Sequence, residues 1–155
     1  MVLERETGLA DQLEAGISVD AEVSKDLLVS IFVPSSPLHD GAVVVQHGRL
    51  ATAGAILPLT LKDNLPDGVG TRHRAAVGIT EETDAVVVVV SEETASISVV
   101  MSGEIVYGLD APRLRKVLVE VLGRSGRELP AEVDEPEPEA GTSLESETAS
   151  ARTGG

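Results

Sequence analysis

The chain has 155 residues, 26 of them acidic and 12 basic, and its formal net charge of −14 argues against general nucleic-acid binding, which needs a basic face. It contains no cysteine, which excludes a disulfide framework, a thiolate zinc site and a cysteine nucleophile. No apolar run approaches the ~20 residues that span a bilayer. From length and composition, we expect one folded domain over residues 1–129 and an acidic, disordered tail over residues 130–155.

The pattern of apolar and polar residues predicts interleaved strands and helices. In chain order, the predicted elements are a strand end at 1–5, a helix at 9–15 ended by Gly16, a helix at 25–32, strands at 42–46 and 49–57, a helix at 71–77, strands at 85–90, 95–101 and 104–107, and a helix at 112–122. Ser24, Thr71 and Asp110 are expected to cap helices. Five consecutive valines at 86–90 suit a strand that is covered on both faces. The fold class is therefore α/β or α+β, with a mixed sheet flanked by helices.

Three polar clusters could carry chemistry, and the first is Leu38–Ala42. It places His39 and Asp40 in a turn just before a buried strand. Asp40 could hold a divalent metal ion or accept a hydroxyl proton, and the backbone N–H groups of Gly41 and Ala42 could meet a phosphate. The alternative is an ordinary turn, in which the aspartate satisfies local backbone groups and the glycine takes a positive φ.

The second cluster, Gly70–Ala75, places Arg72, His73 and Arg74 at the start of a predicted helix. Free N–H donors, the positive end of the helix dipole and two cations together suit an anion such as a phosphate. A surface basic patch that is paired with nearby carboxylates explains these residues equally well.

The third cluster, Ser91–Thr94, follows the run of valines. Ligands of open α/β sheets tend to lie outside the carboxyl ends of strands, where Ser91, Glu92 and Glu93 fall. Glu92 or Glu93 could be a further metal ligand, although a solvated turn is the simpler interpretation of this segment alone.

In this order, the three clusters resemble the diadenylate cyclase family, whose members make cyclic di-AMP from two molecules of ATP. The matching stretches are Asp40–Ala42, Thr71–Arg74 and Val90–Thr94, and the intervening sequence is similar to the membrane-anchored branch as far as Leu122. The resemblance implies a twisted mixed sheet with helices packed around it. It also implies that the transmembrane helices of that branch are missing, so that this chain is expected to be a cytoplasmic piece of a membrane-anchored protein.

The resemblance further implies a role for each cluster. Asp40, Arg72 and His73 would be catalytic, and Asp40, His39 and Glu93 would hold a divalent ion, Mn²⁺ or Mg²⁺. The residues expected to contact ATP are Gly41, Ala42, Leu57 beside the adenine, Thr71, Arg72, His73, Arg74 and Ser91. Because the product is two-fold symmetric, a homodimer of facing protomers, each holding one ATP, would be the catalyst.

Two other hypotheses remain open. A nucleotide-binding or regulatory module of the same fold that has lost catalysis would keep Arg72 and Gly41 but would tolerate the loss of Asp40. A purely structural interaction domain would explain none of the three clusters. The presence of all the motif residues favours the enzyme.

Overall fold

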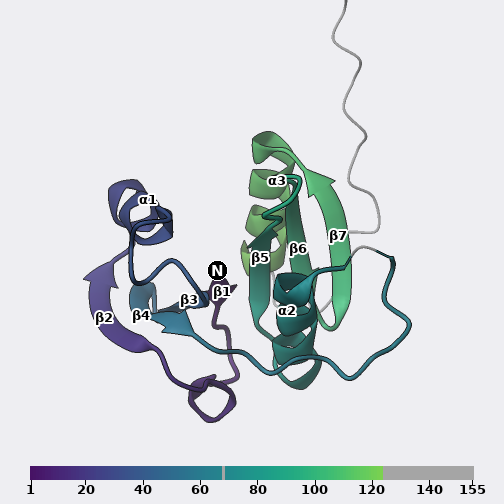
Figure 1. Cartoon of the computed structure of the whole chain (residues 1–155), viewed down its shortest axis with the longest axis horizontal. Coiled ribbons are helices and arrows are strands. Elements are labelled where there is room, and N and C mark those ends of the chain that lie inside the picture. The colour runs from purple at the N-terminus through teal and green to yellow at the C-terminus, as the bar shows by residue number, and fades with distance from the viewer. Residues whose placement is uncertain (68, 124–155) are drawn as a thin grey trace, which may run out of the picture.

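The computed structural model describes residues 1–67 and 69–123, in which seven strands form one sheet in the order β2-β4-β3-β1-β5-β6-β7 (Figure 1). The elements are β1 (Val2–Leu3), the 3₁₀ helix η1 (Ala10–Gln12), β2 (Ile17–Glu22), α1 (Lys25–Phe32), β3 (Ala42–Gln46), β4 (Arg49–Ala55), α2 (Thr71–Glu82), β5 (Val86–Val90), β6 (Ile97–Met101), β7 (Glu104–Leu109) and α3 (Ala111–Gly123). β1 pairs with β3 in parallel, and every other pairing between these strands is antiparallel. The predicted mixed sheet with flanking helices is therefore confirmed, whereas the predicted tail lies outside the described residues.

Helices cover both faces of the sheet. In β5, Val87 packs in one apolar cluster with Ala76 of α2, and its neighbour Val86 packs in another with Val117 of α3. Successive side chains of a strand point to opposite faces, so α2 and α3 lie on opposite sides of β5, as Figure 1 shows. This arrangement explains why the strand can consist of five valines. Ile31 of α1 packs in a third apolar cluster, with Val43 of β3 and with Leu50 and Ala53 of β4.

Two of the three predicted helix caps are confirmed. Ser24 Oγ accepts a hydrogen bond from the N–H of Leu27 at 3.2 Å, and Asp110 Oδ1 accepts one from the N–H of Arg113 at 2.9 Å. The prediction for Thr71 is wrong, because Gly70 occupies the cap of α2 and offers no side-chain hydrogen bond. Thr71 is instead the first helical residue.

Three elements differ most from the sequence predictions, whereas the bounds of the others differ from the predicted ones by at most two residues. β2 was not predicted, and the predicted helix at 9–15 is only the short η1, because Glu14 is extended and bridges to Ile56 beyond the end of β4. α2 runs to Glu82, five residues beyond its predicted end. Among the described residues, no helix combines the length and hydrophobicity that a membrane span requires.

Candidate active site

The first and third clusters lie at the same end of the sheet. Ala42, the first residue of β3, pairs with Ala55, the last residue of β4, so Leu57 follows at this end. β3 is parallel to β1, and β1 is antiparallel to β5, which brings Ser91 after β5 to the same end as Gly41 before β3. The strand pairings therefore gather residues from three separate parts of the chain.

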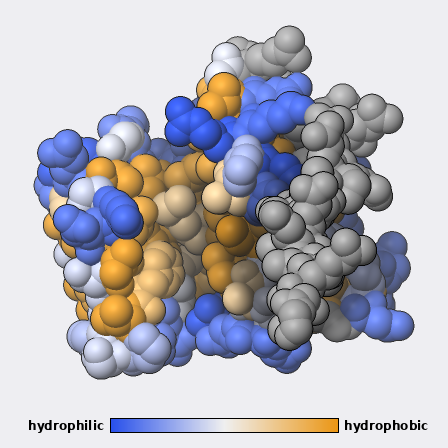
Figure 2. Space-filling model, turned by 90° about the horizontal axis from the view of Figure 1, so that it is seen from above, coloured by the Kyte–Doolittle hydropathy of each residue, from blue (hydrophilic) through white to orange (hydrophobic). Residues whose placement is uncertain are grey.

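The second cluster joins them through an ion pair. The guanidinium Nη2 of Arg72, in the first turn of α2, lies 2.7 Å from Oε1 of Glu92, in the loop after β5. β7 runs parallel to β5, and its arrow ends at the top of Figure 1; Figure 2 shows the molecule from above. The surface in this view is hollowed, with hydrophobic side chains in the hollow and to its left and hydrophilic ones above and below it. Such a surface suits a ligand with an apolar ring and a charged group.

A close backbone contact fixes the position of the first cluster. Gly41 has φ +98°, and a Cβ there would lie 2.8 Å from the carbonyl carbon of Gly54 and 2.9 Å from the carbonyl oxygen of Ala55. Only glycine permits both this conformation and this approach. The exposed Asp40 is thereby anchored against the end of β4 through the backbone of its neighbour.

The predicted metal ligands do not form a preformed site. Within residues 1–67 and 69–123, no three histidine, cysteine or acidic side chains are grouped so that they could hold a metal ion, so His39, Asp40 and Glu93 are not assembled together. His39 donates from Nδ1 to the carbonyl oxygen of Ser36 at 2.7 Å, which leaves Nε2 as its ligand atom. Mg²⁺ and similar ions, however, are commonly held by one or two carboxylates together with substrate phosphates and water. The exposed carboxylate of Asp40 fits that type of site.

The three consecutive residues Arg72, His73 and Arg74 have different surroundings. Arg72 is partly exposed and pairs with Glu92, whereas Arg74 donates from Nη2 to the backbone oxygen of Lys62 at 3.2 Å. His73 is buried, and its Nε2 lies 3.2 Å from the hydroxyl of Ser98 on β6. Its burial lowers its pKa below the ordinary value of 6.5, so the ring is neutral at neutral pH.

The other predicted contact residues surround this end of the sheet. Leu57 and Ala42 both pack, half-buried, on the apolar cluster beneath α2, while Thr71 and Glu93 are exposed. Ser91 Oγ accepts a hydrogen bond from the N–H of Thr94 at 3.3 Å, so the turn that was the simpler interpretation of the third cluster is present. Ser98 was not predicted as a site residue, although it is a lone polar residue in the apolar stretch of β6.

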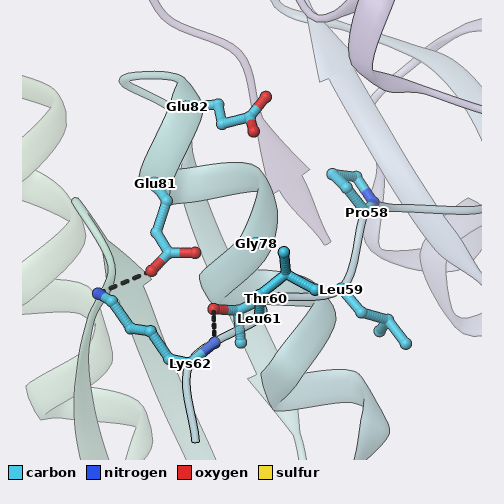
Figure 3. A pocket seen from close by; sticks show the side chains of 8 residues that line it. All are labelled: Pro58, Leu59, Thr60, Leu61, Lys62, Gly78, Glu81 and Glu82. Atoms are coloured by element: carbon cyan, nitrogen blue, oxygen red, sulfur yellow. Dashed lines mark hydrogen bonds and ion pairs between the residues drawn. The ribbon is translucent and has the colours of Figure 1, made fainter.

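A cavity of about 390 Å³ lies elsewhere, against the carboxyl-terminal half of α2 (Figure 3). It is lined by Pro58, Leu59, Thr60, Leu61, Lys62, Gly78, Glu81 and Glu82, none of which was predicted as a site residue. Inside it, Lys62 Nζ and Glu81 Oε1 form an ion pair of 2.7 Å. The candidate active site is therefore the open end of the sheet and not this cavity.

Comparison with known proteins identifies relatives in sequence and in structure. Cyclic di-AMP synthase CdaA of Bacillus subtilis is 42% identical over 118 residues, which are 76% of this chain but only 43% of that protein. Among solved structures, DacA from Staphylococcus aureus, an N166C/T172C double mutant, matches with a TM-score of 0.73 at 44% identity, over 77% of this chain and 79% of that one. A hypothetical membrane spanning protein from Bacillus cereus matches with a TM-score of 0.68 at 41% identity, over 70% of this chain and 53% of that one.

The matching region includes all three clusters. The family model described as DisA bacterial checkpoint controller nucleotide-binding matches residues 1–105, which contain Asp40, Arg72 and Ser91. The predicted family resemblance is thus confirmed by sequence identity, by structural similarity and by the family model. The chain spans less than half the length of the Bacillus subtilis relative. It belongs to the DisA bacterial checkpoint controller nucleotide-binding family.

Proposed function

We propose that this chain is the catalytic domain of a diadenylate cyclase, which joins two molecules of ATP into cyclic di-AMP and releases two molecules of pyrophosphate. The observation that carries the proposal is the convergence at one end of the sheet of the Asp40–Gly41 turn, the first turn of α2 and the loop after β5. The name of the Bacillus subtilis relative, a cyclic di-AMP synthase, supports the same activity.

In the proposed reaction, the 3′-hydroxyl oxygen of each ATP attacks the α-phosphorus of the other. A new P–O bond forms, the bond to the pyrophosphate breaks, and the hydroxyl proton is released to solvent water. Such transfers depend on positioning and on stabilising spread negative charge. Asp40 would hold Mn²⁺ or Mg²⁺ together with substrate phosphate oxygens, and the bound ion would lower the pKa of the attacking hydroxyl.

The remaining residues would bind and orient the nucleotide. Arg72, partly exposed beside its carboxylate partner, would exchange Glu92 for the triphosphate and stabilise the leaving pyrophosphate. The other phosphate contacts would come from the N–H groups of Gly41 and Ala42 and from the side chains of Thr71, His73, Arg74 and Ser91. The half-buried Leu57 would lie against the adenine.

The product has two-fold symmetry, and each protomer carries one set of these residues. We therefore infer that two protomers face each other, each holding one ATP. The similarity to a membrane spanning protein supports a further proposal, that in the full-length protein this domain is anchored to the membrane and lies in the cytoplasm.

The direct test is incubation with ATP and Mn²⁺, followed by chromatography for a cyclic dinucleotide. Binding of ATP without any product would instead favour a catalytically silent regulatory module. Below the dimer dissociation constant, the initial rate should rise with the square of the protein concentration. If specific activity stays constant far below that constant, as measured by sedimentation, one protomer suffices and the facing-dimer mechanism is wrong.

A further inference from the structure

Ser98 is a buried polar residue in an apolar strand. It is completely inaccessible to solvent, and its neighbours in β6 are Ile97, Val99, Val100 and Met101. Alanine would occupy nearly the same volume without placing a hydroxyl in the core, and a buried hydroxyl costs free energy unless it is hydrogen-bonded. The serine therefore needs an explanation beyond packing.

The partner of Ser98 is His73 of the second cluster. The Ser98 hydroxyl lies 3.2 Å from His73 Nε2, and within the described part of the chain no other hydrogen bond involves this hydroxyl. The ring of Tyr107, on β7, flanks the imidazole with its centroid 5.9 Å away and the two planes inclined by 31°. α2, β6 and β7 thus meet at the imidazole, and its orientation is set by a hydrogen bond and a ring contact.

This contact limits what His73 can do for a bound phosphate. Since Nε2 is engaged with Ser98, Nδ1 is the ring nitrogen that remains for a ligand. A neutral imidazole has one donor nitrogen and one acceptor nitrogen. It can donate to a phosphate from Nδ1 only if Nε2 is the acceptor, and a serine hydroxyl can supply the proton that Nε2 then needs.

We propose that Ser98 is a positioning residue, whose hydroxyl donates to Nε2 of His73 and so holds the neutral ring in the tautomer that donates from Nδ1 to the triphosphate. The inference rests on the proposed function, since it takes ATP as the ligand. A neutral donor is suited to this position because Arg72 and Arg74 already place two cations in the same helical turn. A second-layer hydrogen bond of this kind fixes the tautomer of a histidine in many binding sites.

The first measurement is steady-state kinetics of Ser98→Ala. The variant removes one hydroxyl with little change in volume, and we expect kcat/KM for ATP to fall about five- to tenfold, mainly through KM. Ser98→Thr, which keeps the hydroxyl, should recover most of that loss. If its added methyl group prevents folding, Ser98→Ala and the spectroscopic measurement below still decide the question.

Thr80→Val is the matched control. Thr80 is also a buried hydroxyl, and it lies on the same helix, where it donates to Ala76 O at 2.9 Å and accepts from the N–H of Gly103 at 3.2 Å. Its replacement should lower the melting temperature without changing KM for ATP. An equal KM change in both variants would show a general packing effect and would overturn the proposal.

The second measurement is the nitrogen chemical shifts of the imidazole rings, which report the tautomer directly. The chain has only three histidines, so the signals of His73 can be assigned by single substitutions of the other two. At neutral pH, we expect the wild-type proton on Nδ1, a changed tautomer population in Ser98→Ala and no change in Thr80→Val. A wild-type proton on Nε2, or an unchanged spectrum in Ser98→Ala, would refute the inference. If the wild-type chain makes no cyclic dinucleotide, the proposed function fails, and this spectrum still decides the role of Ser98.

Discussion

Replacing Gly78 with alanine tests how the position of α2 is fixed. A Cβ at Gly78 would lie 2.1 Å from the carbonyl oxygen of Pro58, 2.9 Å from its carbonyl carbon and 2.8 Å from the backbone nitrogen of Thr60. Figure 3 shows Gly78 beside this segment, at the edge of the cavity. All three atoms belong to the backbone, so no side chain can rotate to make room.

The expected effect is the balance of three contributions. Alanine is the better helix former by about 1 kcal/mol. Against this, ordinary contact begins at 3.4 Å, so α2 and Pro58 would have to separate by about 1 Å, which costs up to about 3 kcal/mol for an overpacked core. The separation would also strain the hydrogen bond from Thr60 N–H to Arg74 O, of 3.1 Å, worth about 1 kcal/mol. We expect a net destabilisation of about 2–3 kcal/mol.

Urea denaturation measures this effect directly, because the change in midpoint gives the change in the free energy of unfolding. Gly123→Ala, in α3, is the matched control, since a Cβ there has nothing within 4 Å and should leave stability unchanged or slightly higher. Activity of Gly78→Ala should also fall, because a displaced α2 carries Arg72 and Arg74 with it. If Gly78→Ala is as stable as the wild type, the backbone contact does not set the position of the helix.

Three further predictions concern the site. Asp40→Asn should reduce product formation by ~10²-fold or more at an unchanged melting temperature, because it removes the charge but keeps the shape; wild-type turnover would contradict the role of Asp40. Glu92→Gln should strengthen ATP binding by about two- to fivefold, measured by calorimetry at low salt, because it frees Arg72 from a competing carboxylate; unchanged or weaker binding would show that Glu92 does not compete with the nucleotide. Because burial lowers the folded-state pKa of His73, the unfolded chain takes up the proton first, so the free energy of unfolding should fall as the pH drops below the ordinary value of 6.5. His73→Gln should flatten this part of the stability profile, and an identical slope in both proteins would exclude His73 as its cause.

The elements that local signals specify were predicted from the sequence. α1 begins after its serine cap and β3 is a run of apolar residues, and both have the predicted bounds. β2 was overlooked because it is an irregular edge strand, in which Asp20 has φ +46° and the register against β4 shifts between Ser18 and Ala21. α2 was predicted too short because Gly78 disfavours a helix locally, whereas its contact with Pro58 requires a glycine there.

The sequence proposes the candidate site as a set of residues, but it does not predict the contacts that those residues make. The polar residues of the sequence identified the three clusters, and the family resemblance suggested their roles. The strand pairings bring the first and third clusters to one end of the sheet, and an ion pair joins the second cluster to the third. The pairing of Arg72 with Glu92 and the burial of His73 against Ser98 depend on the packing of α2 on β5 and β6. The sequence pattern of α2 cannot predict these partners, because Glu92 and Ser98 lie in later segments of the chain.

The contact between Gly41 and the end of β4 has a consequence for how this site can be engineered or can diverge. At Gly41, every larger side chain meets the same backbone atoms in a conformation with φ +98°, so substitutions should be rejected whatever their chemistry. The neighbouring Asp40 is exposed, so side chains of any size should fit there, and only their chemistry should decide whether the variant makes product. A saturation library can be scored separately for folding and for product formation. Substitutions at Gly41 should fail in both scores, whereas substitutions at Asp40 should fail only in product formation.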